Sequence, residues 1–305
     1  MSAITVIINP YANRGDSQHQ IDAGLQALAT SGLAFDIQLT EYRGHGAELA
    51  EAAARNGAEI IVAAGGDGTV HEVANGILRA AEGSEGVASA TLGILPVGSG
   101  NDFAWGLGLD KGVDLAIDRL RRGQTRIIDV GYVEAEGFPA HYVVNILGGG
   151  FDSQVNIEAH KIMRLRGFAI YIVAVLKTLV IYYRNPHATI RFNDETHEFD
   201  MLMTFVANGP RLGGGFIAAP HARHDDGLFD ICLVHKTTRR DMLLMIPKFM
   251  RGAHLNHPKV TMARAARVEI ESPEGFPSQA DGEIVGNDVR RMVVSLVPQR
   301  LRVIV

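Results

Sequence analysis

A glycine-rich segment that follows an apolar run is the first feature of the sequence that could do chemistry. The run EIIVAA ends in GGDGT (residues 65–69), and a helix-prone segment begins at Val70. Backbone N–H groups at such a strand-to-helix junction lie at the positive end of a helix dipole and form a ready anion site. The spacing matches neither G-x-x-x-x-G-K-[ST] nor G-x-G-x-x-G, which argues against a Walker loop and a dinucleotide fingerprint. Phosphate is therefore the ligand that this segment predicts.

Asp67 is unusual in a phosphate cradle, because a carboxylate repels phosphate unless a cation lies between them. It predicts Mg²⁺-bound phosphate chemistry, with a plain helix cap as the alternative. Two further apolar runs end in comparable loops, since TLGILP leads into VGSGNDF (97–103) and ITVII leads into NPYANRG (9–15). Loops at the carboxyl ends of neighbouring parallel strands meet at one edge of a sheet, where open α/β folds bind ligands.

The elements that must position these loops follow from the pattern of apolar residues. Strand-like runs at 4–8, 35–39, 59–64 and 91–96 alternate with helix-prone segments at 18–31, 47–56 and 70–81. This alternation predicts a Rossmann-like α/β lobe with a mostly parallel sheet and helices on both faces.

After about residue 129 the strand-like runs become more frequent, which predicts a β-rich, β-sandwich-like lobe. The expected strands are 142–146, 188–192, 202–207, 228–234, 267–271 and 292–297. A helical stretch at 155–183, with a possible break at Gly167, interrupts them. We expect domains at 1–128 and 129–305, with room for the last residues to return to the first lobe, and a nucleotide site in the cleft between the lobes.

Composition limits the class of protein. A chain of 305 residues predicts about two domains, and 47% hydrophobic with 21% charged residues excludes a disordered chain. The single cysteine, Cys232, excludes an intramolecular disulfide and a four-cysteine zinc site. The first residues lack the features of a secretory signal, and the apolar stretch 168–183 is short for a transmembrane helix. We therefore expect a cytoplasmic protein.

Charge is segregated along the chain. The net charge is −5, yet residues 158–191 hold six Lys and Arg against one acid, and residues 236–267 hold eight against one. These segments predict peripheral contact with an anionic membrane surface, with solvated basic faces as the alternative. The stretch 168–183, preceded by Lys161, Arg164 and Arg166, would be an apolar wall with basic anchors or a core helix. We expect no nucleic-acid partner, and a homodimer is compatible with the sequence.

The ordered motifs resemble the diacylglycerol kinase catalytic-domain family, in particular its soluble bacterial lipid kinases, which include relatives of sphingosine kinases. The resemblance begins with NPYANRG, LTEYRGHGAELA, GGDGTVHEVANGI and LGILPVGSGNDFAWGL. It continues with RIIDVGYV, VNILGGGFDSQV, GFAIYIVAVLKTL, ANGPRLGGGFIAAPHARHDDGLFDI and QADGEI, and so covers nearly the whole chain.

The resemblance implies an ATP-dependent kinase that phosphorylates a lipid hydroxyl such as that of diacylglycerol, with Mg²⁺. Glu283, in the DGE sequence, matches the family's proposed proton acceptor, and Asp67 would hold the catalytic Mg²⁺ or compete for the role of base. The positions that match the family's nucleotide-binding residues are Asn9, Pro10, Tyr11, Ala12, Asn13, Thr40, Gly65, Gly66, Asp67, Gly68, Thr69, Val70, His71 and Ser99.

The resemblance also implies a structural Mg²⁺ in the loop PHARHDDGLFD. Its matching ligands are the Asp226 carboxylate and the backbone carbonyls of Arg223 and Leu228. Oxygen-only ligation suits Mg²⁺, and Asp225 is a rival ligand. Asp129 matches an aspartate thought to connect this site with the nucleotide lobe.

The sequence departs from the family pattern at three positions. Asn13 stands where glycine is frequent, Ser99 replaces the commoner threonine, and Trp105 stands where arginine is usual. These departures affect the expected rate more than the expected reaction. An NAD kinase, which shares GGDGT, and a non-catalytic lipid- or nucleotide-binding regulator are the alternative functions, and the sequence does not specify which lipid is phosphorylated.

Overall fold

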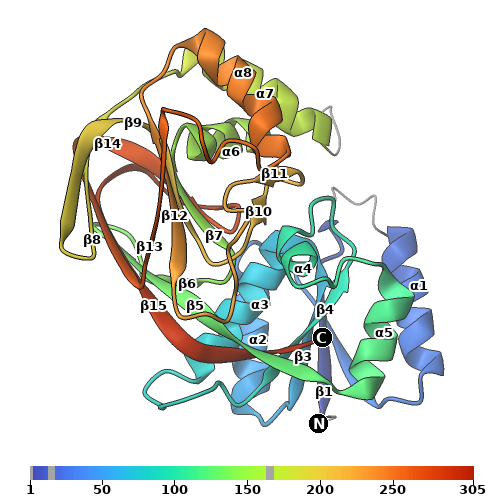
Figure 1. Ribbon diagram of the computed structural model, residues 1–305. Helices are drawn as coiled ribbons and strands as arrows, with labels where there is room; N and C mark the ends of the chain where they lie inside the picture. Colours follow the sequence, from blue (N-terminus) through green and yellow to red (C-terminus); the bar gives the residue numbers. More distant parts are fainter. Residues whose placement is uncertain (1–2, 13–17, 163–167) are drawn as a thin grey trace. The chain divides into compact units, whose positions relative to one another are not determined.

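The computed structural model describes residues 3–12, 18–162 and 168–305, and the chain divides into two compact units (Figure 1). Unit 1 comprises Met1–Val130 together with Pro298–Val305, and unit 2 comprises Gly131–Val297. Two long strands, β5 (Thr125–Ala135) and β15 (Glu283–Ile304), begin in one unit and end in the other.

Unit 1 alternates strands and helices, which confirms the predicted Rossmann-like α/β lobe. Its strands are parallel and lie in the order β15-β4-β3-β1-β2, with α2 and α3 on one face and α1 and α5 on the other (Figure 1). Before β5 its elements are β1 (Ile4–Ile8), α1 (Gln18–Thr30), β2 (Phe35–Leu39), α2 (His45–Arg55), β3 (Ile60–Gly65), α3 (Asp67–Ala80), β4 (Thr91–Pro96), α4 (Asp102–Gly106) and α5 (Val113–Arg122).

The central strands of unit 1 are apolar because helices cover both of their faces. Strands β1 and β4 are buried along their whole length, as expected for a parallel sheet between two helical layers. Helix α3 begins at Asp67, three residues before the predicted start at Val70. The extended backbone of Gly66 serves as the N-cap, so the glycine junction already belongs to the helix terminus.

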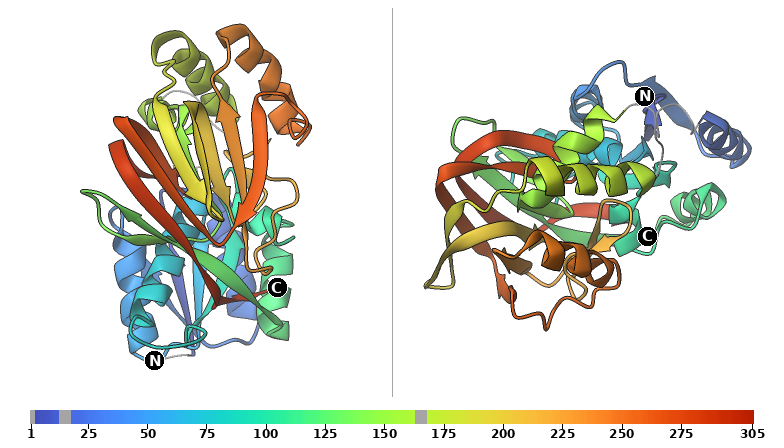
Figure 2. Two further views of the ribbon diagram at one scale, coloured as in Figure 1. Left: turned by 60° about the vertical axis from the view of Figure 1, so that its left-hand side comes forward. Right: turned by 90° about the horizontal axis from the view of Figure 1, so that it is seen from above.

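Unit 2 is an antiparallel β structure with three helices on one side, which confirms the predicted β-sandwich-like lobe (Figure 2). Its main sheet has the strand order β13-β12-β9-β7-β14-β15, and β8 pairs with both β9 and β14. Its elements between β5 and β15 are β6 (His141–Val143), β7 (Ile146–Gly150), α6 (Phe151–Lys161), α7 (Phe168–Ile181), β8 (His187–Phe192), β9 (Glu195–Ala207), β10 (Arg211–Leu212), β11 (Phe216–Ile217), β12 (Phe229–His235), α8 (Arg239–Met250), β13 (Val260–Ala265) and β14 (Arg267–Ala280).

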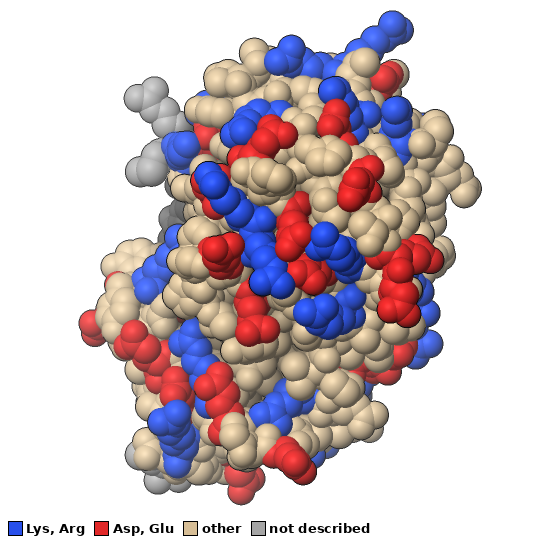
Figure 3. All heavy atoms as spheres, turned by 90° about the vertical axis from the view of Figure 1, so that its left-hand side faces the viewer, with Lys and Arg blue, Asp and Glu red and all other residues tan. Residues whose placement is uncertain are grey.

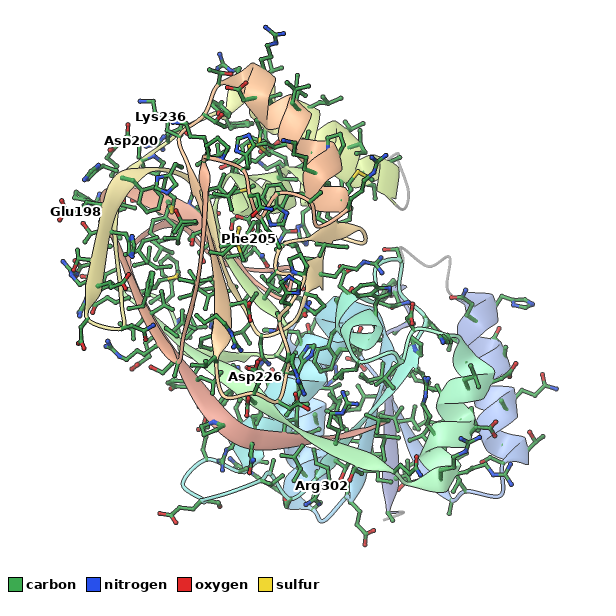
Figure 4. The ribbon with its side chains drawn as sticks, viewed as in Figure 1. Glu198, Asp200, Phe205, Asp226, Lys236 and Arg302 are labelled. Carbon is green, nitrogen blue, oxygen red and sulfur yellow. The ribbon has the colours of Figure 1, made fainter. Side chains whose placement is uncertain are left out.

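Strand β12 shows why the sequences of the predicted strands in unit 2 are continuously apolar. Ile231 and Leu233 enter a core enclosed by strands, whereas Cys232 and Val234 enter a second core that α6, α7 and α8 cover. Side chains alternate along a strand, so a strand between two cores needs apolar residues at every position. Phe205 of β9 points into the helix-covered core, while β9 carries Asp200 to the outer surface (Figure 4).

Two expected elements of unit 2 differ in the structure. The predicted strand 142–146 is two strands, β6 and β7, because the amides of Val144 and Asn145 donate to a side-chain carboxylate instead of continuing a ladder. The predicted helix 155–183 is two helices, and α6 begins four residues earlier, after Gly150 with φ +94°. The predicted break at Gly167 lies outside the described residues.

Candidate active site

The carboxyl ends of three strands of unit 1 meet at one edge of the sheet, as predicted. Ile8 of β1 is paired with Ala64 of β3, and Gly65 at the end of β3 is paired with Pro96 at the end of β4. The loops that follow are therefore neighbours. Asn9 Nδ2 lies 3.3 Å from Thr69 Oγ1 and donates to it, which joins the first loop to the GGDGT segment.

The two glycine junctions pack directly against each other. A Cβ atom on Gly98 would lie 2.2 Å from the Gly66 Cα, and one on Gly65 would lie 2.1 Å from the Thr69 Oγ1. Glycine is therefore required at position 98 by backbone packing and at position 65 by the Thr69 side chain, whatever ligand they meet. What points to an anion is the N-terminus of the 14-residue helix α3, which begins immediately after Gly66 at this edge.

Asp67 has a defined protein partner. Its Oδ1 accepts the backbone N–H of Phe103 at 3.1 Å, in the first turn of the short helix α4. The carboxylate thus links the GGDGT segment to the NDF segment and caps a helix other than its own. This contact positions Asp67 at the strand ends without deciding between the cation-binding and base roles predicted for it.

The other predicted nucleotide-binding residues divide into surface and buried positions. Thr40 is 6% exposed and its N–H donates to the Ile8 carbonyl at 2.9 Å, which places it at the same edge. Val70 and His71 are buried within α3, and Ala12 is buried as well.

The surface positions are Pro10, which is half-buried, and Tyr11 and Ser99, which are exposed. Asn13 lies outside the described residues.

Asn101 belongs to this edge, although the sequence analysis assigned it no role. It has φ +52°, its Oδ1 accepts the Gly98 N–H at 3.0 Å, and its Nδ2 donates to the Gly98 carbonyl at 2.9 Å. Asparagine tolerates the left-handed region better than most residues, so its place after Gly-Ser-Gly was the signal for this turn.

Glu72, three residues after Thr69, is a second position that the sequence analysis passed over. Its two carboxylate oxygens accept the N–H groups of Gly44 and Gly46 at 2.7 and 2.9 Å. These amides open helix α2, so a negative charge there also interacts favourably with the helix dipole. Glu72 therefore fixes the loop between Thr40 and helix α2.

In unit 2, Glu283 follows a two-residue hairpin turn between β14 and β15. Asp281 and Gly282 have φ values of 52° and 90°, and Ala280 pairs with Glu283 across the turn. Positive φ at both central residues is the signature of a type I′ turn, for which Asp-Gly is a preferred sequence. The sequence DGE thus encodes the turn as well as the acid that follows it.

The Asp281 carboxylate anchors this turn. It accepts three backbone N–H groups, from Val144, Asn145 and Ile146, each at 2.9 Å. Asp281 is 8% exposed, and a buried carboxylate of this kind is stabilised by hydrogen bonds from several amides. Glu283 itself is half-buried and directly follows this turn.

Asp226, in the loop predicted to hold a structural Mg²⁺, is paired with an arginine of β13. The Arg264 guanidinium binds one carboxylate oxygen of Asp226, and the other accepts the Leu228 N–H at 3.3 Å. Arg264 also lies 3.5 Å from Asp230, whose pKa is raised by burial and held down in part by this guanidinium.

Arg264 therefore already occupies one oxygen of the predicted ligand Asp226, and the structural Mg²⁺ of this loop stays a prediction. A cation would compete with Arg264 for the same Asp226 oxygen, and the rival ligand Asp225 lies 3.4 Å from the Arg223 guanidinium. Within the described residues, no group of three or more His, Cys, Asp or Glu side chains is arranged to hold a metal.

Asp129 has a structural role within unit 1. It is 2% exposed, and its Oδ1 accepts the N–H of Gln299 at 2.8 Å. The carboxylate thereby joins β5 to the last segment of the chain. The predicted link from Asp129 to the metal loop stays a prediction.

Both parts of the chain are similar to known protein families. Residues 3–133 match the family described as "Diacylglycerol kinase catalytic domain", and residues 145–305 match "YegS C-terminal NAD kinase beta sandwich-like domain". The chain belongs to the diacylglycerol kinase-like family of lipid kinases. It is 32% identical to "Probable lipid kinase YegS-like" of Chromohalobacter salexigens over 81% of this chain and 76% of that one. It is 28% identical to "Diacylglycerol kinase" of Bacillus subtilis over 94% of this chain and 91% of that one.

Solved structures of this lipid kinase fold are similar over the whole chain. The crystal structure of a diacylglycerol kinase from Bacillus anthracis has a TM-score of 0.71 at 21% identity, covering 99% of this chain and 96% of that one. The yeast NADH kinase complexed with NADH has a TM-score of 0.52 at 10% identity, covering 96% and 77%. Both likenesses show a shared fold alone. Among the helices described, none is both long and apolar enough to cross a bilayer.

Proposed function

We propose that this lipid kinase family member transfers the γ-phosphate of ATP to the hydroxyl of diacylglycerol or a related lipid alcohol, with Mg²⁺. The observation that supports it most is the meeting of the β1, β3 and β4 ends with the N-terminus of α3 in unit 1. That edge offers the phosphates of a nucleotide backbone N–H groups, a helix dipole and the polar side chains of Asn9 and Thr69.

The reaction needs a base for the lipid hydroxyl. In the proposal the Glu283 carboxylate accepts the hydroxyl proton, the alcohol oxygen forms a bond to the γ-phosphorus, and the bond to the β,γ-bridging oxygen breaks to release ADP. Mg²⁺ would neutralise charge on the phosphates, with Asp67 as its candidate ligand. Asp67 remains the rival base, and a nucleotide site between the two lobes remains a prediction.

Contact with an anionic membrane, as predicted from charge, would be made by the α7–α8 surface. We define it by the exposed apolar residues Val173, Leu176, Val180, Ile181, Leu243, Leu244 and Met250. Helices α7 and α8 lie side by side at one end of unit 2 (Figures 1 and 2), and Arg239 Nε donates to the Leu179 carbonyl at 2.9 Å. Exposed Arg240, Lys248 and Arg251 border the apolar residues and suit anionic headgroups. Arg164 and Arg166 lie outside the described residues.

Transfer of label from γ-labelled ATP tests the reaction. Lipid alcohols in mixed micelles and NAD⁺ would be offered as acceptors, and label should enter a lipid. Glu283→Gln should lower turnover by about 10²-fold or more with ATP affinity retained, whereas Glu195→Gln, on the exposed start of β9, should not. Label in NAD⁺ alone would favour the NAD kinase alternative, and ATP binding without any transfer would favour a regulator. Full turnover by Glu283→Gln would reject Glu283 as the base and leave Asp67.

Vesicle co-sedimentation tests the α7–α8 surface. Binding should rise with the fraction of phosphatidylglycerol in phosphatidylcholine vesicles and fall with salt. Leu244→Glu should weaken binding by about tenfold, because it places a carboxylate in the apolar surface. Leu115→Glu, at an exposed apolar position of α5 in unit 1, is the matched control. Binding that ignores both lipid charge and Leu244→Glu would reject this surface.

A further inference from the structure

Two buried side chains hold the turn that precedes Glu283. Gln279 Oε1 accepts the Gly282 N–H at 2.7 Å, and Asn156 Nδ2 donates to the Gly282 carbonyl at 2.5 Å. Gln279 is 3% exposed and Asn156 is 9% exposed. The N–H and the carbonyl of Gly282 are therefore both held by side chains. A type I′ turn forms without such side-chain contacts.

The orientation of the Gln279 amide is set by a third residue. Its Nε2 donates to Asp152 Oδ2 at 3.3 Å, so the amide oxygen is the atom left to face the Gly282 N–H. A carboxylate accepts only, and thus selects one of the two flip states of the amide. Asp152 and Asn156 are four residues apart on α6, which places both on the same face of that helix.

Glycine at position 148 leaves the space that this contact occupies. Gly148 of β7 is paired with Gln279 of β14 in the sheet. A Cβ on Gly148 would lie 1.9 Å from Asp152 Oδ2 and 2.6 Å from Gln279 Nε2. The GGGFD segment therefore supplies both the carboxylate and the room for it.

We propose that Asp152, Gln279 and Asn156 act together as positioning residues for Glu283. This inference rests on the proposed function, because it gives the three residues a task in presenting the base of that reaction. They fix Gly282, and Gly282 fixes the backbone from which Glu283 emerges at the start of β15. Since a displacement of about 1 Å at a reacting group can cost about 10²-fold in rate, loss of this support should reduce kcat before it reduces ATP binding.

An exchange of donor and acceptor tests the network. At pH 8, Gln279→Glu should lower kcat by about tenfold or more with KM for ATP within about twofold, because Asp152 loses its amide donor and two acidic side chains then compete for one proton. The double variant Asp152→Asn with Gln279→Glu restores one donor between the two side chains, and the carboxylate introduced on β14 can again accept the Gly282 N–H. It should recover kcat to within about threefold of the parent protein. Asn287→Asp adds the same charge at an exposed site of β15 and should change nothing.

Amide hydrogen exchange gives a readout that does not depend on turnover. Gln279→Ala should increase exchange at Gly282 by about tenfold or more, since its N–H loses the acceptor, while the amides bound by Asp281 stay protected. Unchanged exchange at Gly282, or a double variant that folds but stays as slow as Gln279→Glu, would overturn the positioning role. If the parent protein transfers no phosphate, the proposed function fails while the exchange result still decides the network.

Discussion

Four carboxylates in the motifs that resemble the lipid kinase family accept hydrogen bonds from backbone amides. Asp67, Glu72, Asp129 and Asp281 each accept at least one main-chain N–H, and Asp281 accepts three. Such charge-assisted bonds fix loops that have no regular ladder. A substitution of one of these acids can therefore lower activity by changing loop geometry as well as by removing a catalytic group. A test of a catalytic role should measure ligand binding and stability in parallel.

The first prediction separates packing from ligand contact at neighbouring positions. Gly98→Ala places a Cβ 2.2 Å from the Gly66 Cα, and neither backbone can give way cheaply. We expect it to lower the free energy of unfolding by about 1–3 kcal/mol and to abolish nucleotide binding. Ser99→Ala, at an exposed position, should change stability by less than about 0.5 kcal/mol while weakening ATP binding. Denaturant unfolding and a fluorescent nucleotide titration measure both, and a stable, ATP-binding Gly98→Ala protein would contradict the packing.

The second prediction concerns the pH dependence of stability at Asp152. Burial raises its pKa to about 7, against the opposing hydrogen bonds from Gln279 and Ser153. A raised carboxyl pKa means that the folded state holds the proton more tightly, so the stability from this group is lost as pH rises from about 4 to about 7. Asp152→Asn should remove that loss and be more stable than the parent by about 1–3 kcal/mol at pH 8. The difference should shrink toward pH 4 in urea unfolding, and a pH-independent difference would contradict it.

Helix α6 links the β14–β15 turn of unit 2 to helix α7. One face carries Asp152 and Asn156 to the β14–β15 turn, while Glu158 faces α7. Glu158 is fully buried and lies 2.6 Å from both the Lys161 and the Lys177 ammonium groups. Lys177 belongs to α7, so this ion pair joins the helix behind the turn to the helix that exposes the α7–α8 surface.

A third prediction tests that helix–helix link. Glu158→Gln should lower the free energy of unfolding by about 2–3 kcal/mol, because a buried partner of two ammonium groups loses its charge. Glu51→Gln, which breaks the more exposed Glu51–Arg55 pair within α2, should cost less than about 0.5 kcal/mol. Thermal unfolding compares the two proteins. Equal effects would show that the buried pair contributes no more than a surface pair.

The outer strands of unit 2 carry pairs of a different kind. Arg191 lies 2.6 Å from Glu271, and Arg291 lies 2.7 Å from Glu269, across neighbouring strands. Figure 3 shows basic and acidic side chains interspersed on this face of the molecule. Mixed charge on exposed strands discourages pairing with other chains, and it sets this face apart from the apolar α7–α8 surface.

The last residues of the chain, Pro298–Val305, return to unit 1. Arg302 and Val303 pair in parallel with β4, so the last residues complete the sheet of unit 1. Arg300 is 8% exposed and its guanidinium donates to the carbonyls of Ala81, Ser84 and Gly86. Unit 1 therefore consists of two pieces that are distant in sequence.

The fourth prediction follows from this return. Arg300→Ala should lower the free energy of unfolding by about 2–3 kcal/mol, because three carbonyls lose their charged donor. Arg302→Ala, two residues away on the same strand and half-buried, should cost less than about 0.5 kcal/mol. Hydrogen exchange at residues 81–88 should rise only in the first variant. Unchanged protection there would contradict the anchoring role of Arg300.

Local patterns determined much of this protein by themselves. The alternation of apolar runs predicted the α/β lobe, because strand, helix and turn preferences act over a few neighbouring residues. The lipid kinase family was predicted from the resemblance of the ordered motifs. The meeting of the GGDGT and GSGND loops also followed, since parallel strands place their carboxyl ends at one edge.

The contacts that support the site residues depend on tertiary packing. Nothing in the sequence spacing brings Asp152 to Gln279, Asp281 to the amides of 144–146, or Arg264 to Asp226. Each contact joins segments far apart in the chain, and its geometry depends on how the sheets and helices pack. Hydrogen bonds and ion pairs act over a few ångströms, so the packing that sets those distances also selects the partners.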